Sequence, residues 1–262
     1  MAASALEFTD SAAVPALLGP QPAGTLLRNI LRVYRRHFGV LMACSLLPML
    51  PCIVLLKWLT AIKSPWVLLA VPPYMVATFV AGGAMTVVVS DICLGNRPTL
   101  AHAYGHILGQ RRWWRMLSTG LLLVVMAWAG LVLLVLPGVW VMVRGFLTSI
   151  VVVLEGRKGM DAIKRSFALT KGQAWRIVGL TLLPALLAVI VLFLCDMIAI
   201  SVGALILHDR AGLDLLVGTV GDVLGQVLFT PVIGITGVLL YYDQRVRREA
   251  YDVQTLAEDL MR

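Results

Sequence analysis

Residues 116–154 read MLSTGLLLVVMAWAGLVLLVLPGVWVMVRGFLTSIVVVL, an apolar stretch of 39 residues in which Arg144 is the only charged side chain. At ~1.5 Å per residue, a helix of this length would cover nearly twice the ~30 Å hydrocarbon layer of a bilayer. Pro137-Gly138 lies near its middle and is a turn signal. The stretch therefore predicts two membrane-spanning helices joined by a short turn.

Four other blocks have the same character, at residues 38–56, 66–90, 177–207 and 215–242. Each is about as long as, or longer than, the ~20 residues that a spanning helix needs. Apolar residues make up 60% of the chain and charged residues 14%, with a mean hydropathy of +0.89, which lies outside the range of soluble domains. We therefore expect an all-α polytopic membrane protein with six transmembrane helices.

The formal net charge of +8 would suggest nucleic acid, but the distribution of the basic residues indicates a membrane. Of the 22 Lys and Arg residues, 18 fall on one side of the predicted spans, whereas Lys57, Lys63 and Arg210 fall on the other. By the positive-inside rule, the basic side and both termini are cytoplasmic. Basic residues near the surface also attract anionic lipid by ~1 kcal/mol each. Anionic membrane lipids are thus expected partners, and nucleic acid is not.

Three segments outside the spans show helical apolar spacing among basic residues, at 26–38, 99–115 and 160–176. We expect each to form an interfacial amphipathic helix that precedes a pair of spans. This order is consistent with a threefold internal repeat, or simply with hairpins that each need an entry helix. The expected organisation is a disordered cytoplasmic tail at 1–24, a six-helix membrane domain at 25–252 and a cytoplasmic C-terminal tail at 253–262.

Four polar side chains lie inside the predicted spans, and they form the first candidate site: Arg144, Asp196, Asp222 and Gln226. A charge at the bilayer centre costs ~2.5–3.5 kcal/mol on insertion scales, so such residues usually face protein or water and have partners. A structural pair between Arg144 and an aspartate is one interpretation. A substrate or proton site is a second, and solvation at the outer face is a third.

A second candidate site lies where the last span leaves the membrane. The pairs Asp243 with Arg247, Arg245 with Glu249 and Arg248 with Asp252 are each four residues apart, which predicts a charge ladder on a helix that continues into the cytosol. We also expect Glu155 to pair with Arg165, Arg245 or Arg247. The candidate residues of this cytoplasmic rim are Glu155, Arg165, Ser166, Lys171, Tyr242, Asp243, Arg245, Arg247 and Glu249.

Patterns that would indicate catalysis or metal binding are weak. His102 and His106 are four residues apart, but no third ligand accompanies them as it would in a zinc-protease helix. The four cysteines show no paired-ligand spacing, and the chain has no phosphate-binding glycine loop or nucleophile elbow. We therefore expect neither a metal site nor a cofactor.

The rim sequences resemble the membrane domain that is attached to some bacterial glycerophosphoryl diester phosphodiesterases and that also occurs alone. The resemblance is clearest over residues 116–252 and looser from Arg28 onward. It is carried by Pro137-Gly138 with Arg144 downstream, Leu154-Glu155-Gly156, Ala162-Ile163-Lys164-Arg165-Ser166, Leu169-Thr170-Lys171-Gly172 and the segment from Tyr241 to Asp252. The resemblance implies a six-helix module of the bacterial inner membrane.

The phosphodiesterase activity of that family belongs to a separate barrel domain with a His-Arg-Gly signature, which this sequence lacks. The expected function is a non-catalytic scaffold or anchoring module that organises lipids, a membrane-protein partner or further copies of itself at the cytoplasmic face. The alternative is a small-solute transporter or channel lined by the intramembrane polar residues. An enzyme acting on lipid head groups is a third possibility without an evident nucleophile.

The distribution of basic residues predicts the topology directly. Reporter fusions should show the periplasm after Ala61, Pro137 and Arg210. They should show the cytoplasm after Gln110, Gly159 and Arg262. Periplasmic activity at Gly159 would contradict the assignment of two spans to residues 116–154, because two spans return the chain to the cytoplasmic side.

Overall fold

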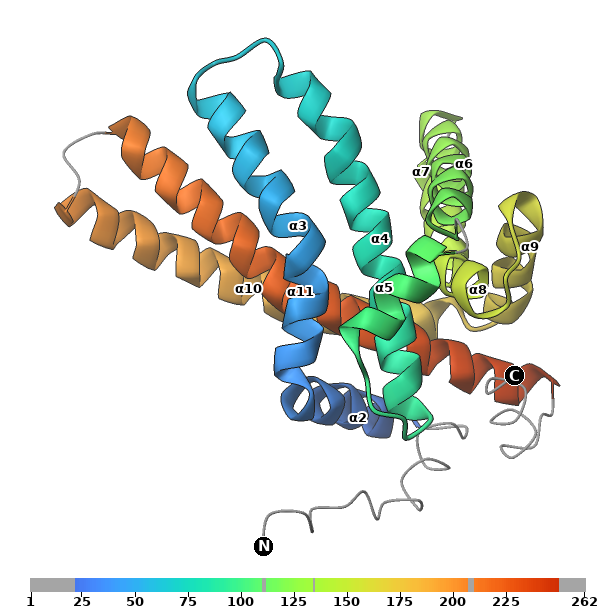
Figure 1. The fold of residues 1–262 in the computed structure, drawn as a ribbon. Helices are drawn as coiled ribbons and strands as arrows, with labels where there is room; N and C mark the ends of the chain where they lie inside the picture. Colours follow the sequence, from blue (N-terminus) through green and yellow to red (C-terminus); the bar gives the residue numbers. More distant parts are fainter. Residues whose placement is uncertain (1–21, 110–111, 134, 207–209, 250–262) are drawn as a thin grey trace, which may run out of the picture.

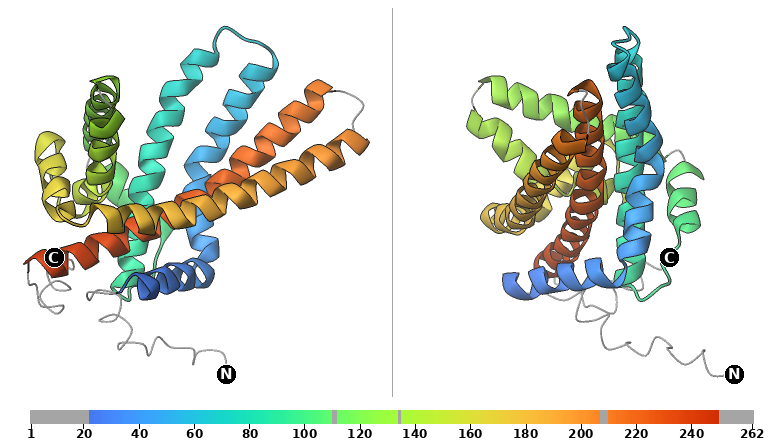
Figure 2. Two further views of the ribbon diagram at one scale, coloured as in Figure 1. Left: turned by 180° about the vertical axis from the view of Figure 1, so that it is seen from behind. Right: turned by 90° about the vertical axis from the view of Figure 1, so that its left-hand side faces the viewer.

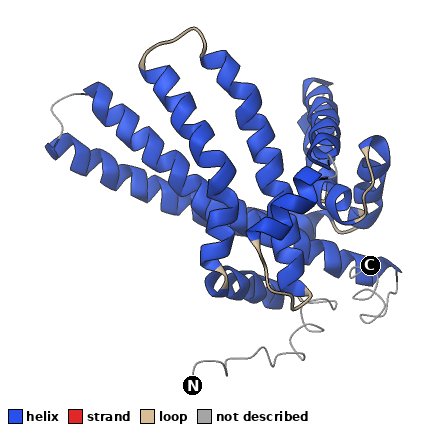
Figure 3. Cartoon of the chain, in the orientation of Figure 1, coloured by secondary structure: helices blue, strands red, loops and turns tan. Residues whose placement is uncertain are grey.

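The described part of this computed structural model, residues 22–109, 112–133, 135–206 and 210–249, is helical with short connections, and it contains no strand (Figure 3). Six helical segments are long and apolar enough to cross a membrane, as the sequence predicts. They are α3 (Phe38–Ala61), α4 (Val67–Cys93), α6 (Arg112–Leu133), α7 (Val135–Gly145) continued by α8 (Thr148–Leu154), α10 (Ala174–Ile206) and α11 (Arg210–Glu249).

Three shorter helices precede the pairs of long ones: α2 (Ala23–Arg36), α5 (Leu100–Gly109) and α9 (Gly159–Thr170). In α2 the buried residues are Leu26, Asn29, Ile30 and Val33, while Arg28, Arg32, Arg35 and Arg36 are exposed. The helix is thus amphipathic, as its spacing predicts. It begins at Ala23. Residues 1–21 and the predicted C-terminal tail lie outside the described residues.

The helices form a fan (Figure 1). The hairpins α3–α4, α6–α7 and α10–α11 diverge from a common base, where α2, α5 and α8 lie (Figures 1 and 2). Helix α11 crosses this base and packs against α3, α4, α2 and α9. We call this region, where α2, α5, α8 and α9 meet the adjoining ends of α4, α10 and α11, the base of the fan.

The buried core lies at the base, whereas the outer parts of the hairpins expose large apolar side chains. Tyr241, Tyr242 and Leu147 are fully buried at the base, while Val132 and Leu136 at the tip of the α6–α7 hairpin are among the most exposed apolar residues. This pattern fits helices that span a membrane. Lipid solvates their exposed apolar side chains, and the helix itself satisfies the backbone groups that lipid cannot.

The turn between α6 and α7 falls slightly earlier than the sequence predicts. Helix α6 ends at Leu133 and α7 begins at Val135, so Pro137-Gly138 lies in the first turn of α7 rather than at the turn itself. Proline is tolerated there because the first amide groups of a helix have no intrahelical acceptor. The adjacent Gly138 allows α7 to pack closely against Gly130 of α6. A Cβ on Gly130 would lie 2.8 Å from the backbone nitrogen of Gly138, so α6 and α7 meet backbone to backbone.

Replacing Gly130 should therefore open this hairpin. We expect Gly130→Val to lower the free energy of unfolding by about 1–3 kcal/mol, because the added atoms meet backbone that cannot move aside. The neighbouring Ala129 is exposed, so Ala129→Val should change it by less than about 0.5 kcal/mol. Thermal unfolding of both variants in the same detergent measures the difference. Equal effects of the two substitutions would contradict the close approach.

Candidate functional site

The carboxylate of Glu155 ties three elements together at the base. Glu155 caps the C-terminal end of α8. Its oxygens accept hydrogen bonds from the Nε of Arg165 on α9 at 3.0 Å and from the hydroxyl of Tyr241 on α11 at 3.0 Å. Arg157 adds a third contact, with its Nε 2.9 Å from the carboxylate. The predicted pairing of Glu155 with one of three arginines is confirmed for Arg165.

A second carboxylate, that of Asp243, is more deeply buried. Its side chain is only 1% exposed, and it lies between two guanidinium groups. The Nη2 of Arg176 on α10 lies 3.1 Å from the Asp243 carboxylate, and the Nε of Arg247 lies 3.0 Å from it. The Nε2 of Gln244 donates a hydrogen bond to the same carboxylate at 3.3 Å. The spacing of four correctly predicts the Asp243–Arg247 pair. The predicted ladder is a surface feature, however, whereas the Asp243 side chain is buried and also pairs with an arginine from another helix.

Tyr242 joins α11 to the end of α4. Its hydroxyl lies 2.7 Å from the Oγ of Ser90, and its ring is fully buried. Together with Glu155 and Asp243, this contact completes a network that we call the base network. Its members are Ser90, Glu155, Arg157, Arg165, Arg176, Tyr241, Tyr242, Asp243, Gln244 and Arg247.

Sequence reasoning missed five members of the base network, namely Ser90, Arg157, Arg176, Tyr241 and Gln244. Arg176 stands at the start of a span among other basic residues, where it reads only as an orientation signal. Ser90 reads as the end of an apolar block. The only available signal is that Asp243 lies at the end of a span, where a second basic partner from a neighbouring span is to be expected.

Arg144 lies beside α9. Its backbone carbonyl accepts hydrogen bonds from the Oγ of Ser166 at 2.6 Å and the Oγ1 of Thr170 at 3.3 Å. Its guanidinium carbon lies 4.3 Å from the ring centroid of Trp140, a cation–π geometry. The Nε atom of Arg144 is buried and has no hydrogen-bond partner among the described residues. Through its hydrogen bond to the Arg144 carbonyl, Ser166 positions the α7–α8 junction against α9.

The other predicted intramembrane residues are placed only by their backbone. Asp196 lies in α10, and Asp222 and Gln226 lie in α11, but their side chains fall outside the described part of the structure. The pairing of Arg144 with an aspartate accordingly stays a prediction. At the rim, Lys171 is exposed at the end of α9, and Arg245 donates to the Tyr241 hydroxyl at 3.4 Å. The side chain of Glu249 and the residues beyond it also lie outside the description.

The two histidines of α5 connect this helix to its neighbours. The Nδ1 of His102 lies 3.1 Å from the carboxylate of Asp91 at the end of α4, and His106 contacts Arg112 at the start of α6. Burial lowers the pKa of His106, and the charge of Arg112 lowers it further, so the neutral ring can accept a hydrogen bond from the guanidinium group. Within the described ranges, no group of three or more His, Cys, Asp or Glu side chains could hold a metal ion.

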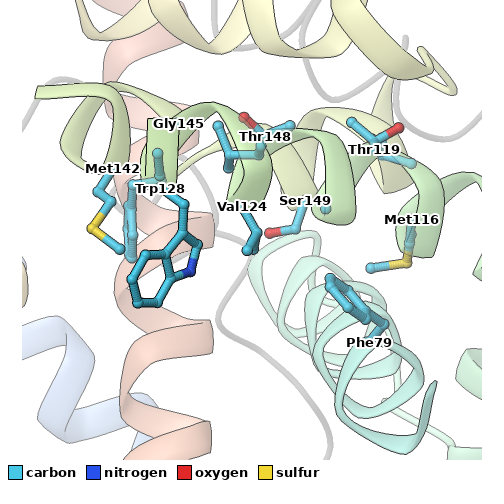
Figure 4. Close-up of a pocket in the computed structure, with 14 residues that line it drawn as sticks. Phe79, Met116, Thr119, Val124, Trp128, Met142, Gly145, Thr148 and Ser149 are labelled. Atoms are coloured by element: carbon cyan, nitrogen blue, oxygen red, sulfur yellow. The ribbon is translucent and has the colours of Figure 1, made fainter. Parts of the chain in front are cut away.

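A cavity of about 360 Å³ lies between α4, α6 and the α7–α8 segment (Figure 4). Most of its wall is apolar, and no charged side chain lines it. Hydroxyl groups come from Thr119, Thr148 and Ser149. Thr119 accepts a hydrogen bond from the backbone amide of Gly159 at 2.8 Å, which places the loop before α9 next to this cavity.

No family model, curated protein or solved structure matches this chain.

The base network predicts unequal roles for the two arginines that contact Glu155. The side chain of Arg165 is 19% exposed and that of Arg157 49% exposed. We expect Arg165→Ala to lower the free energy of unfolding by about 2 kcal/mol, because a charge-assisted bond to a largely buried acid is lost. Arg157→Ala should cost less than about 1 kcal/mol, as is typical of an exposed pair. Thermal unfolding of the two variants in one detergent measures the difference, and equal losses would contradict the assignment.

Proposed function

We propose that this protein is a non-catalytic scaffold of the bacterial inner membrane that organises anionic lipids at its cytoplasmic face. The observation that best supports this proposal is that the charged residues of the base fall into two groups, one paired within the chain and one exposed. The buried acids Glu155 and Asp243 are neutralised by arginines of the same chain. Such a closed network makes a rigid base, because breaking it would leave an uncompensated buried charge.

Many other basic side chains of the base face outward. They include Arg28, Arg35 and Arg36 on α2, Lys158 before α9, and Lys164 and Lys171 on α9. Each basic residue near an anionic surface attracts it by ~1 kcal/mol. A rigid base with a basic outer surface is suited to gathering anionic head groups, or the acidic surface of a membrane-protein partner.

The proposal includes the orientation. We place α2, α5 and α9 in the interface at the cytoplasmic side, and both termini in the cytoplasm. The bias of the basic residues toward one side of the spans supports this orientation. We also propose kinship with the membrane domain of bacterial glycerophosphoryl diester phosphodiesterases, on the strength of the rim sequences. The family's phosphodiesterase chemistry belongs to its barrel domain and forms no part of the proposal.

One observation favours the alternative of a small-solute transporter. Arg144 has a buried Nε without a hydrogen-bond partner among the described residues, although it lies in a segment that could cross a membrane. An intramembrane charge of this kind can mark a solute path. In the transporter interpretation, Arg144 would line that path together with Asp196, Asp222 and Gln226.

The scaffold proposal predicts a lipid preference that depends on the basic face. In vesicles of phosphatidylethanolamine and phosphatidylglycerol, spin-labelled phosphatidylglycerol should be retained at the protein surface roughly threefold more than spin-labelled phosphatidylcholine. Replacing Arg28, Arg35 and Arg36 with glutamine should remove most of this preference. The matched control replaces Lys57, Lys63 and Arg210, three basic residues of the opposite side, and should retain it. Electron spin resonance of the motionally restricted lipid measures the effect.

The same vesicles separate the two functions. Two results together would favour the transporter over the scaffold. The protein would show no lipid preference, and its vesicles would pass a solute or ion by a flux that Arg144→Leu abolishes. Equal loss of preference in both triple variants would show that the effect is one of net charge and would contradict the role of α2.

A further inference from the structure

The cavity between α4, α6 and the α7–α8 segment has an elongated wall. Figure 4 shows Met116 and Phe79 at one end and Trp128 and Met142 at the other, with Val124 and Ser149 between them. Met116 and Trp128 both belong to α6 and are 12 residues apart, which at ~1.5 Å per residue is about 18 Å along the helix. Half of the ~30 Å hydrocarbon layer is about 15 Å. The cavity thus runs along about one leaflet.

The cavity is open toward the surroundings of the spans. Trp128 is 63% exposed and Met142 54% exposed, and Val124 between them is also exposed. These residues belong to segments that could cross a membrane, so the medium at the opening is lipid. The volume of about 360 Å³ falls within the ~300–1,000 Å³ that is typical of ligand pockets.

One hydroxyl in the cavity wall lacks a partner. Thr148 is 2% exposed, and its Oγ1 makes no hydrogen bond within the described structure. A threonine in a helix can donate to the carbonyl four residues earlier. Here that carbonyl belongs to Arg144, and it already accepts hydrogen bonds from Ser166 and Thr170. The Oγ1 atom also has almost no accessible surface, so it lies behind the cavity wall and does not contact a ligand in the cavity.

The end of the cavity near Met116 lies close to basic residues. Arg115 precedes Met116 and is exposed, and the loop that carries Lys158 reaches Thr119 through the amide of Gly159. The opposite end, at Trp128 and Met142, is apolar. A ligand that matches this wall has an apolar chain inside the cavity and a polar group outside it.

We infer that this cavity seats one acyl chain of a membrane lipid. The chain extends along α6 toward Trp128 and Met142, and the head group lies near Arg115 and Lys158. A polar solute is a poor occupant, because the apolar wall could not replace its hydrogen bonds to water. The inference deepens the proposed lipid-organising function and rests on it for the membrane setting, whereas the seat itself needs no preference among head groups.

A photoactivatable lipid tests the seat in the full-length protein. The probe is phosphatidylglycerol with a diazirine in the middle of one acyl chain, in bilayer discs of phosphatidylethanolamine and phosphatidylglycerol. After illumination, mass spectrometry should find cross-links concentrated on peptides that contain Trp128 and Met142. Val124→Trp fills the cavity and should reduce these cross-links at least about fivefold. Val125→Trp, a larger side chain on an exposed neighbour that does not line the cavity, should leave them within about twofold.

A second cavity-filling variant guards against misfolding. Ser149→Phe enters the same space from α8, and both variants are first compared with the wild type by thermal unfolding. Loss of cross-links in stable Val124→Trp or Ser149→Phe protein supports the seat. Cross-links that persist in both stable variants, or that spread evenly over all spans of the wild type, overturn it.

The same probe with a phosphatidylcholine head group separates this inference from the proposed function. Equal labelling of the cavity by both lipids supports the acyl seat and counts against the proposed anionic preference. A preference for phosphatidylglycerol in the electron spin resonance measurement, without labelling at Trp128 and Met142, retains the proposed function and overturns the seat.

Discussion

A carboxylate that is removed from water must have compensating charge close by, and this constraint organises the base of the fan. Asp243 has almost no exposed surface, so it needs both Arg176 and Arg247, and one of these comes from a different helix. Glu155 imposes the same requirement on α9 and α11. The pairing of charges therefore helps to decide how the helices cross. Apolar contact alone gives little preference within the membrane, because lipid solvates apolar side chains equally well.

Away from the base, a different kind of interaction holds each hairpin together. Gly130 and Gly138 bring α6 and α7 into backbone contact, and Ala77 and Ala81 of α4 are buried with Met49 and Ile53 of α3. Small residues allow such close packing where burial of apolar surface has no driving force. The α6–α7 and α3–α4 hairpins are thus internally tight. The apolar cavity lies between α4 of one hairpin and α6, α7 and α8.

The sequence was sufficient for the features that depend on local periodicity. Block length predicts six spans, and a spacing of four predicts the Asp243–Arg247 pair. The contacts Ser90–Tyr242 and Arg176–Asp243 join residues 152 and 67 positions apart, and no local pattern encodes them. Pro137-Gly138 predicts the turn a few residues after the point where α6 gives way to α7, because proline is acceptable both in a turn and in the first turn of a helix. Block length also predicts nothing about a cavity, which depends on how unlike helices meet.

The distance along the chain between Ser90 and Tyr242 bears on how the protein is made. A ribosome delivers α4, α8 and α9 to the membrane well before it has synthesised Tyr241, Tyr242 and Asp243. During that interval Ser90 and Arg176 lack the α11 partners that they have in the finished structure. The contacts of the base are thus completed only when α11 emerges. A chain that is cut short before residue 241 would hold all the earlier spans without the residues that fasten them, and it would be a natural target for membrane proteases.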